Sequence, residues 1–128
     1  MSVNKEISIL IIDDYQTMRG VIRNLLRKLG FDNILEAATT DEATAVLKEK
    51  KCGLVIFDWQ TGPMSGADFL RFVREDDKLK EIPFIAVCAE SNQELTEKMC
   101  QSGISDFIAK PFTEAMLKKK MTALLGDF

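Results

Sequence analysis

The segment Val55-Ile56-Phe57 ends abruptly in a carboxylate, Asp58. A continuous apolar run without polar alternation is typical of a strand that is buried on both faces of a parallel sheet. In open sheets of parallel strands, ligands bind in a crevice outside the carboxyl ends of the strands, and Asp58 would emerge there. This segment therefore predicts both the fold class and the place of the functional site.

Two other apolar runs also end in charged residues. Residues 9–12 are followed by Asp13 and Asp14, and residues 107–109 are followed by Lys110. If the first and third strands are neighbours in a doubly wound sheet, the carboxylates converge at one edge. Clustered carboxylates repel each other, so they need a cation or shifted pKa values. Hard oxygen ligands with positions open for water favour Mg²⁺.

Strand-like and helix-like segments alternate along the whole chain. Between the apolar runs, apolar residues recur at three- and four-residue spacing, which is typical of amphipathic helices. This alternation predicts an α/β domain with a parallel sheet, and right-handed crossovers would place helices on both faces. The predicted strands are Ile7–Ile12, Ile34–Ala38, Leu54–Phe57, Pro83–Cys88 and Phe107–Ala109.

Local signals predict where several helices begin and end. Thr39 with Glu42 resembles a capping box, and Thr113 is a candidate N-cap of the last helix. Gly30 follows the first helix at a position that favours glycine. The residues of the last helix expected to face the core are Met116, Leu117, Met121, Leu124 and Leu125.

The composition excludes several classes of function. The net charge of −3 argues against nucleic-acid binding through bulk charge, and no apolar run approaches the ~20 residues of a membrane span. Residues 1–6 lack the regions of a signal peptide, and the three scattered cysteines fit a reducing compartment, so we expect a cytoplasmic location. The absence of histidine excludes Ser-His-Asp and Cys-His catalysis and most zinc sites.

The acidic edge suggests phosphoryl chemistry. A carboxylate beside Mg²⁺ can attack a phosphoryl donor to form an acyl phosphate, and the metal and a lysine such as Lys110 then offset the charge of the transferred group. Each residue has an ordinary alternative role. Asp14 alone would be a helix N-cap, Asp58 a solvated loop residue and Lys110 a surface lysine. Their joint placement favours the site.

The motifs together resemble the response-regulator receiver family, over essentially the whole chain. The resemblance implies one receiver domain over residues 1–128 without a separate output domain, most similar to the single-domain chemotaxis regulators. It also implies a flavodoxin-like (βα)5 fold with strand order 2-1-3-4-5, an order taken from the family, which is itself a standard example of it. The matching segments are Ile11-Ile12-Asp13-Asp14, Phe57-Asp58-Trp59, Met64-Ser65-Gly66, Ala89-Glu90 and Lys110-Pro111-Phe112-Thr113.

The resemblance implies an acceptor and a metal site. Asp58 matches the phosphoacceptor, and Asp14, Asp58 and the backbone carbonyl of Gln60 match the Mg²⁺ ligands. Asp13 matches the acidic residue that acts through metal-bound water. Gln60 and Glu90 match positions that tune the rate of phosphoryl loss.

The resemblance also implies a switch and its partners. Lys110, Ala89 and the residue at Cys88 match the phosphoryl-binding positions, and Phe107 with Cys88 matches the switch. The donor would be a phosphohistidine on a sensor kinase or phosphotransfer protein. A protein target would bind the fourth helix, fifth strand and last helix, without nucleic acid or membrane insertion. The protein would be a switch that phosphorylates and dephosphorylates itself rather than a turnover enzyme.

Two positions depart from the family pattern. Cys88 stands where the family usually has Thr or Ser, and a thiol is a weaker donor and a larger atom than a hydroxyl. Pro63 follows Gly62, whereas the family usually has its proline at position 62, in the loop that carries Gln60. We therefore predict that Asp58 is phosphorylated but that its coupling to the active state is weakened.

Three alternative functions remain open from the sequence. A degenerate receiver that binds partners without phosphorylation is favoured by Cys88 and the shifted proline, and disfavoured by the intact acidic residues and Lys110. A phosphohydrolase is suggested faintly by Asp58-Trp59-Gln60-Thr61, but Gln60 stands where a general acid is needed. A flavodoxin-like redox protein would need a phosphate-binding loop after the first strand, and the sequence has none.

Overall fold

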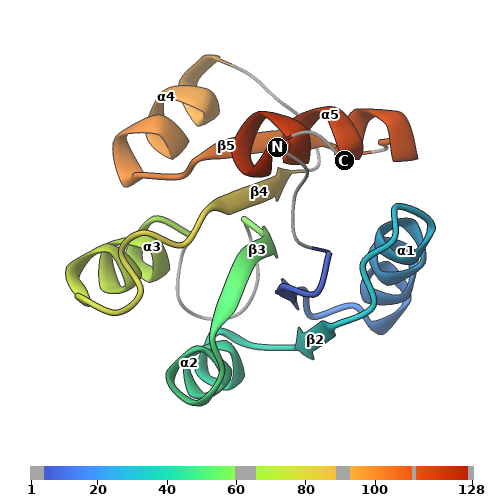
Figure 1. Cartoon of the computed structure of the whole chain (residues 1–128). Helices are drawn as coiled ribbons and strands as arrows, with labels where there is room; N and C mark the ends of the chain where they lie inside the picture. The colour runs from blue at the N-terminus through green and yellow to red at the C-terminus, as the bar shows by residue number, and fades with distance from the viewer. Residues whose placement is uncertain (1–4, 60–65, 89–92, 111, 127–128) are drawn as a thin grey trace.

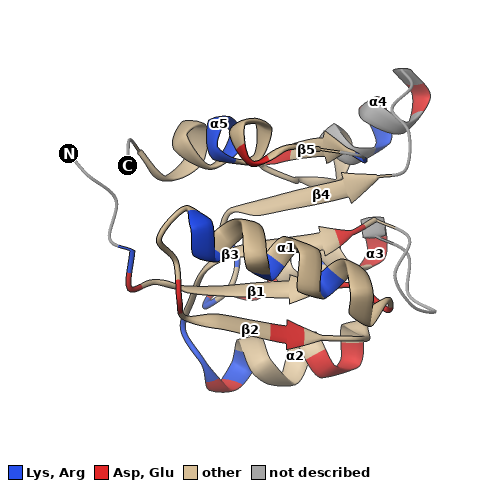
Figure 2. Cartoon of the chain, turned by 90° about the vertical axis from the view of Figure 1, so that its right-hand side faces the viewer, with Lys and Arg blue, Asp and Glu red and all other residues tan. Residues whose placement is uncertain are grey.

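The structure, a computed structural model, describes residues 5–59, 66–88, 93–110 and 112–126. Strands and helices alternate through these residues, and the strands form one parallel sheet in the order β2-β1-β3-β4-β5 (Figure 1). Figure 2 shows the strands side by side with their carboxyl ends at one edge. The predicted fold class and strand order are confirmed. The strands are β1 (Ser8–Ile12), β2 (Ile34–Ala37), β3 (Cys52–Asp58), β4 (Phe84–Cys88) and β5 (Asp106–Ala109), and the helices are α1 (Gln16–Lys28), α2 (Thr40–Glu49), α3 (Gly66–Glu75), α4 (Gln93–Ser102) and α5 (Glu114–Leu125).

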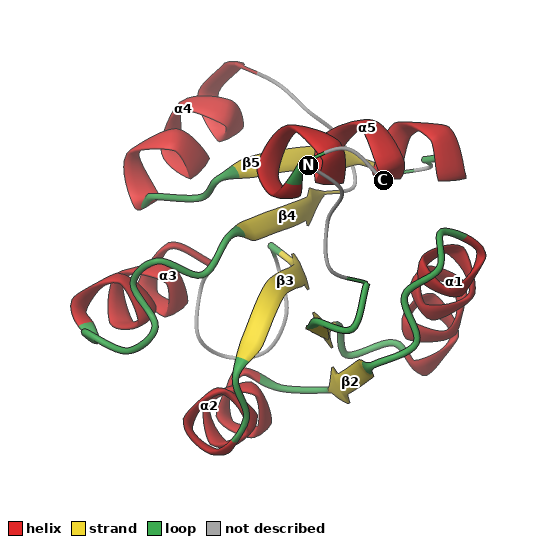
Figure 3. Cartoon of the chain, viewed as in Figure 1, coloured by secondary structure: helices red, strands yellow, loops and turns green. Residues whose placement is uncertain are grey.

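Helices cover both faces of the sheet, with α1 and α5 on one face and α2, α3 and α4 on the other (Figure 3). Side chains alternate between the faces along each strand. Ile56 packs with residues of α1 and α5, whereas Val55 and Phe57 pack with residues of α2 and α3. The central strands are therefore apolar on both sides, which explains their continuous apolar sequences. Among the described residues, no helix has the length and apolar character needed to span a membrane.

The predicted helix ends are confirmed at three places. Thr39 Oγ1 accepts a hydrogen bond from the Glu42 backbone N–H at 3.1 Å, and Thr113 Oγ1 accepts one from Met116 N–H at 3.2 Å. The Glu42 carboxylate accepts from the Ala38 N–H at 2.8 Å, one residue earlier than in a standard capping box. Gly30 has φ of 101°, a conformation that glycine adopts without steric cost.

One expectation from the sequence was wrong, and one ordinary alternative role is excluded. Met116 does not face the core, because its side chain is 44% exposed while Leu117 and Met121, one helical turn apart, occupy the buried line of α5. The alternative role of Asp14 as an N-cap is excluded, because the N-cap residue of α1 is Tyr15 and no side chain of the described residues caps this helix. The Tyr15 N–H instead donates to Asp13 Oδ1 at 2.9 Å.

Arg74, in α3, ties three segments together. Its guanidinium donates hydrogen bonds to the carbonyls of Lys80, Ile82 and Gly103 at 2.8, 2.8 and 3.0 Å. It also lies 5.1 Å from the centroid of the Phe84 ring. Burial lowers the pKa of Arg74, but a guanidinium stays charged at neutral pH. The planar group thus holds the connection between α3 and β4 against the end of α4.

We expect Arg74→Lys to lower the free energy of unfolding by about 1.5–3 kcal/mol, because an ammonium cannot reach all three carbonyls in the same geometry. Urea denaturation followed by circular dichroism measures this change. Arg71→Lys is the matched control on the same helix, since Arg71 is exposed and its pair with Asp68 is long, at 3.8 Å. Equal losses in the two variants would contradict the assigned role.

Candidate functional site

The carboxyl ends of β1 and β3 bring two of the predicted acidic residues together. Ile12 pairs with Phe57 across the two strands, so Asp13 and Asp58 occupy the next positions. The helices that follow these strands, α1 and α3, lie on opposite faces of the sheet (Figure 1). Neighbouring strands with diverging connections form the crevice at which open α/β sheets bind ligands.

Lys110 reaches this crevice from the end of β5. Its Nζ lies 2.9 Å from Asp58 Oδ2, in an ion pair whose side chains are only 23% and 13% exposed. The backbone supports this placement, because Lys110 N–H donates to the Cys88 carbonyl at 2.8 Å. Burial alone would lower the pKa of Lys110, but the hydrogen bond and charge of Asp58, with the charges of Asp13 and Asp14, raise it overall. Lys110 is therefore protonated and positively charged beside Asp58 at neutral pH.

Asp13 is buried, with 1% of its surface exposed. Burial raises its pKa, the hydrogen bond from Tyr15 opposes that rise, and the charge of Asp58 adds to it. Its Oδ1 accepts a hydrogen bond from the Tyr15 N–H, whereas its Oδ2 is buried and has no hydrogen-bond partner within the part of the chain that the structure describes. A buried carboxylate oxygen without a partner is costly, so it calls for a cation or for a water molecule held by one.

Arg19, in α1, is a contributor that the sequence reasoning missed. Its Nη1 donates to the Asp13 backbone carbonyl at 2.5 Å, and its Nε lies 3.2 Å from Glu36 Oε1 in β2. Arg23 Nη1 pairs with the other Glu36 oxygen at 2.6 Å. The turn that carries Asp13 is thus held to α1 and to the edge strand. The spacing of Arg19 and Arg23 on one face of α1 was the available signal, but their partner depends on the strand order.

The predicted metal ligands are brought together only in part. Within the described ranges, no three acidic or cysteine side chains are grouped closely enough to hold a metal ion. Asp14 is exposed, and Gln60, Ala89 and Glu90 lie outside the described residues. The buried Oδ2 of Asp13, which no other described residue hydrogen-bonds, and the hard oxygen donors nonetheless fit Mg²⁺ in chemistry. The carboxylates would have to draw closer to share an ion.

Cys88, at the end of β4, is buried and 3% exposed. Its Sγ lies 3.7 Å from the Ile108 carbonyl oxygen, to which the thiol donates a hydrogen bond. Burial raises the pKa of Cys88, the charge of Asp58 adds to that rise, and Lys110 opposes it. The group is therefore a neutral thiol next to the acidic crevice.

Phe107, the predicted switch residue in β5, is partly buried and packs against the core on the α2–α3 face. Lys120 Nζ, from α5, lies 5.4 Å from the centroid of the Phe107 ring and 3.0 Å from Asp106 Oδ1. A cation above an aromatic ring stabilises that ring position. Phe107 thus joins the core to the surface formed by β5 and α5.

Comparison with known families gives one match over most of the chain. The family described as "Response regulator receiver domain" matches residues 9–122. Chemotaxis protein CheY-3 of Vibrio cholerae is 41% identical over 119 residues, which are 93% of this chain and 92% of that protein. Chemotaxis protein CheY of Pseudomonas aeruginosa is 41% identical over 113 residues, covering 88% and 91% of the two chains.

Solved structures share the fold. The Vibrio cholerae chemotaxis protein CheY4 superposes with a TM-score of 0.86 at 24% identity, covering 94% of this chain and 99% of that chain. The receiver domain of the sensor histidine kinase PA1611 of Pseudomonas aeruginosa has a TM-score of 0.85 at 25% identity, covering 95% and 99%. That structure has a magnesium ion coordinated in its active-site cleft.

Proposed function

Because this chain belongs to the response-regulator receiver family and is a CheY-like receiver of a two-component system, we propose that Asp58 accepts a phosphoryl group. The donor is a phosphohistidine on a sensor kinase or phosphotransfer protein. The observation that carries the proposal is the 2.9 Å ion pair between Lys110 Nζ and Asp58 Oδ2, at the crevice edge of the sheet. This pair supports the proposal, because a carboxylate can act as the nucleophile and an adjacent cation can offset the charge of the transferred group.

The reaction exchanges one bond to phosphorus for another. An oxygen of Asp58 attacks the phosphorus atom, the bond from phosphorus to the donor imidazole nitrogen breaks, and an acyl phosphate forms on Asp58. Lys110 Nζ exchanges the carboxylate oxygen for a phosphoryl oxygen, where a charge-assisted hydrogen bond is strong. Hydrolysis of the acyl phosphate returns the carboxylate, so the protein acts as a switch and not as a turnover enzyme.

We propose that Mg²⁺ is held by Asp14, Asp58 and the Gln60 backbone carbonyl, with Asp13 acting through a bound water. When bound, the ion supplies positive charge that offsets the phosphoryl oxygens. Asp13 supports this, because its buried Oδ2 has no hydrogen-bond partner among the described residues and is suited to such a water. The Arg19 contact holds the Asp13 backbone in place for that contact.

We propose that the output is protein contact on the surface of α4, β5 and α5. Phe107 and Lys120 lie on this surface. Lys110 directly follows β5, the strand that carries Phe107, so a movement of Lys110 would be passed to this strand. The two relatives above are chemotaxis proteins, so chemotaxis signalling in the cytoplasm is the proposed setting. Neither nucleic acid nor membrane insertion is needed for this role.

The test is intact mass spectrometry after incubation with acetyl phosphate and Mg²⁺. The wild-type protein should gain the mass of one phosphoryl group, and Asp58→Asn should gain none. Asp77→Asn is the matched control, because the Asp77 side chain is 95% exposed and lies outside the crevice. Equal phosphorylation of wild type and Asp58→Asn would overturn the assignment of the acceptor.

A second candidate is a degenerate receiver that binds its partner without phosphorylation. The observation in its favour is the Cys88 thiol, which donates to the Ile108 carbonyl and offers no hydroxyl to a phosphoryl group. Beryllofluoride, a phosphoryl mimic, separates the two candidates. An adduct that requires Asp58 supports the phosphorylated switch, and partner binding that ignores the adduct supports the degenerate receiver.

We expect Cys88→Thr to enlarge the conformational response to beryllofluoride. The threonine hydroxyl can accept or donate at the crevice, whereas the buried thiol is a weak donor. Amide shifts of β5 and α5 in ¹⁵N-labelled protein measure the response. Cys88→Val is the control, because valine has the shape of threonine without its hydroxyl. Equal responses in wild type and Cys88→Thr would contradict the expectation.

A further inference from the structure

An open groove of about 590 Å³ lies at the amino ends of β3 and β4. We call it the basal groove and define it by its lining, residues 47–53 and residues 78, 79 and 81–83. The groove starts beside Cys52, whereas Asp58 ends the same strand. At about 3.3 Å per residue, the two ends of β3 are roughly 20 Å apart. The basal groove is therefore separate from the phosphorylation crevice.

The floor of the basal groove is apolar. Leu47, Leu79 and Cys52 are buried beneath it, and Ile82 and Pro83 are half-buried at its side. A volume of this size falls within the range of roughly 300–1,000 Å³ that is typical of ligand pockets. The floor can therefore accept an apolar group of a ligand.

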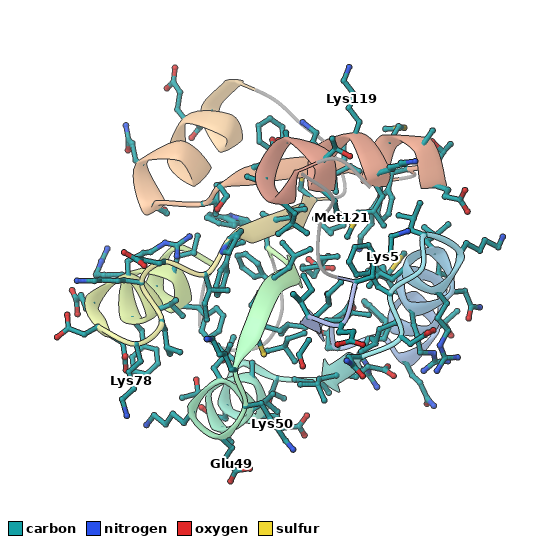
Figure 4. All side chains as sticks on the ribbon, viewed as in Figure 1. Lys5, Glu49, Lys50, Lys78, Lys119 and Met121 are labelled. Carbon is teal, nitrogen blue, oxygen red and sulfur yellow. The ribbon has the colours of Figure 1, made fainter. Side chains whose placement is uncertain are left out.

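The rim of the basal groove is basic in a protein whose net charge is −3. Four exposed lysines, Lys48, Lys50, Lys51 and Lys78, stand around it with two glutamates, Glu49 and Glu81. Figure 4 shows Lys50 and Lys78 on the same side of the molecule, away from Lys119 on α5.

The rim lysines make few interactions with other described residues of the protein. Among the described residues, none of them forms an ion pair with a carboxylate. Lys48 Nζ lies 6.0 Å from the centroid of the Phe72 ring, at the long end of a cation–π contact. Their positive charge is thus available to a partner.

From these features we propose that the basal groove docks an acidic segment of a partner protein, with one apolar side chain of that segment on the floor. The lysines attract the acidic residues of the segment. The rest of the protein carries net negative charge and repels the segment, which favours binding at the basal groove. The mixed rim favours a peptide over a uniform polyanion such as nucleic acid. A phosphate chain would meet Glu49 and Glu81, whereas a peptide can present an amide or a basic residue there.

The docking is independent of the phosphoryl state. The groove residues lie at the opposite ends of the strands from Asp58, and the intervening sheet is a packed core. Packed cores resist small displacements. A partner bound there leaves the crevice open to a kinase, so the groove recruits or tethers a protein without competing for phosphorylation.

The experiment is an NMR titration of the ¹⁵N-labelled protein with the peptide acetyl-Glu-Asp-Leu-Asp-Glu-amide. Saturable amide shifts should concentrate in residues 47–53 and 78–83. Lys50→Glu with Lys51→Glu should weaken binding at least about tenfold by reversing two rim charges. Lys28→Glu with Lys119→Glu is the matched control, because it makes the same change in net charge elsewhere and should leave affinity within about twofold. A peptide with glycine for leucine should bind about tenfold more weakly.

Several results would overturn the proposal. These are shifts concentrated at the carboxyl ends of the strands, shifts that do not saturate, and equal weakening in the two double variants. If tripolyphosphate binds the groove as tightly as the peptide, the ligand of the groove is a small anion and not an acidic protein segment. Beryllofluoride should leave the affinity for the peptide unchanged. A large change in affinity would show that docking depends on the phosphoryl state. Because the titration needs no phosphorylation, its outcome is separate from that of the Asp58 experiment.

Discussion

Replacing Phe57 by alanine should lower the free energy of unfolding by about 3–5 kcal/mol, a large part of the stability of a domain of this size. Phe57 is 2% exposed and lies at the centre of a group of rings. Its centroid is 5.6 Å from that of Phe84, 5.9 Å from Trp59 and 6.0 Å from Phe69. The substitution removes these contacts and leaves a cavity next to Asp58, which follows Phe57 in β3.

Urea denaturation followed by circular dichroism and by Trp59 fluorescence measures the change. Phe72→Ala is the matched control, since it makes the same chemical change in α3 at a ring that is 37% exposed. We expect the control to cost about 1 kcal/mol or less. Similar losses in both variants would show that the ring cluster around Phe57 does not stabilise the sheet as described.

Replacing Lys110 by methionine should weaken beryllofluoride binding about 10- to 100-fold. Methionine keeps the length of the side chain and removes its charge. A hydrogen bond to a charged group contributes about 1.5–3 kcal/mol, and each 1.4 kcal/mol is about a tenfold change in affinity. The effect should lie near the upper end, because the Lys110–Asp58 pair is largely shielded from water, with 23% and 13% of the side chains exposed.

Fluorescence of Trp59 during titration with beryllofluoride and Mg²⁺ measures this loss. Lys119→Met removes one exposed lysine from α5 and should bind the mimic like wild type. Mg²⁺ alone should still alter Trp59 fluorescence in Lys110→Met, because the carboxylates remain and a competing cation is gone. An affinity within twofold of wild type would contradict the role of Lys110 toward the phosphoryl group.

The strands and helices and their sequence along the chain were predictable from short-range patterns, whereas the order of the strands in the sheet came from the family resemblance. Apolar runs located the strands to within two residues at either end, and Thr39, Thr113 and Gly30 marked helix ends as expected. These signals work because capping and left-handed turns depend on residues only a few positions apart. Met116 failed because apolar spacing alone does not set the rotation of a helix against the sheet.

The convergence of Asp13, Asp58 and Lys110 at one edge of the sheet was predictable from the sequence, but the contacts of these residues were not. Asp13 and Asp14 are adjacent, and local sequence patterns do not show which of them faces the core, yet Asp13 is buried and Asp14 is exposed. The Arg19 contact with the Asp13 carbonyl and the Cys88 contact with the Ile108 carbonyl depend on strand register and helix placement. Such contacts join residues brought close only by tertiary packing, which no local pattern records.

The pairing of Lys110 with Asp58 also has a consequence for folding during synthesis. The two residues are 52 positions apart, and three adjacent strands, β3, β4 and β5, must be aligned before they meet. Contacts of such long sequence separation form late, because loop closure must precede them. A nascent chain that ends before β5 carries Asp58 without its lysine. The ion pair beside Asp58 is therefore acquired only when the last strand joins the sheet.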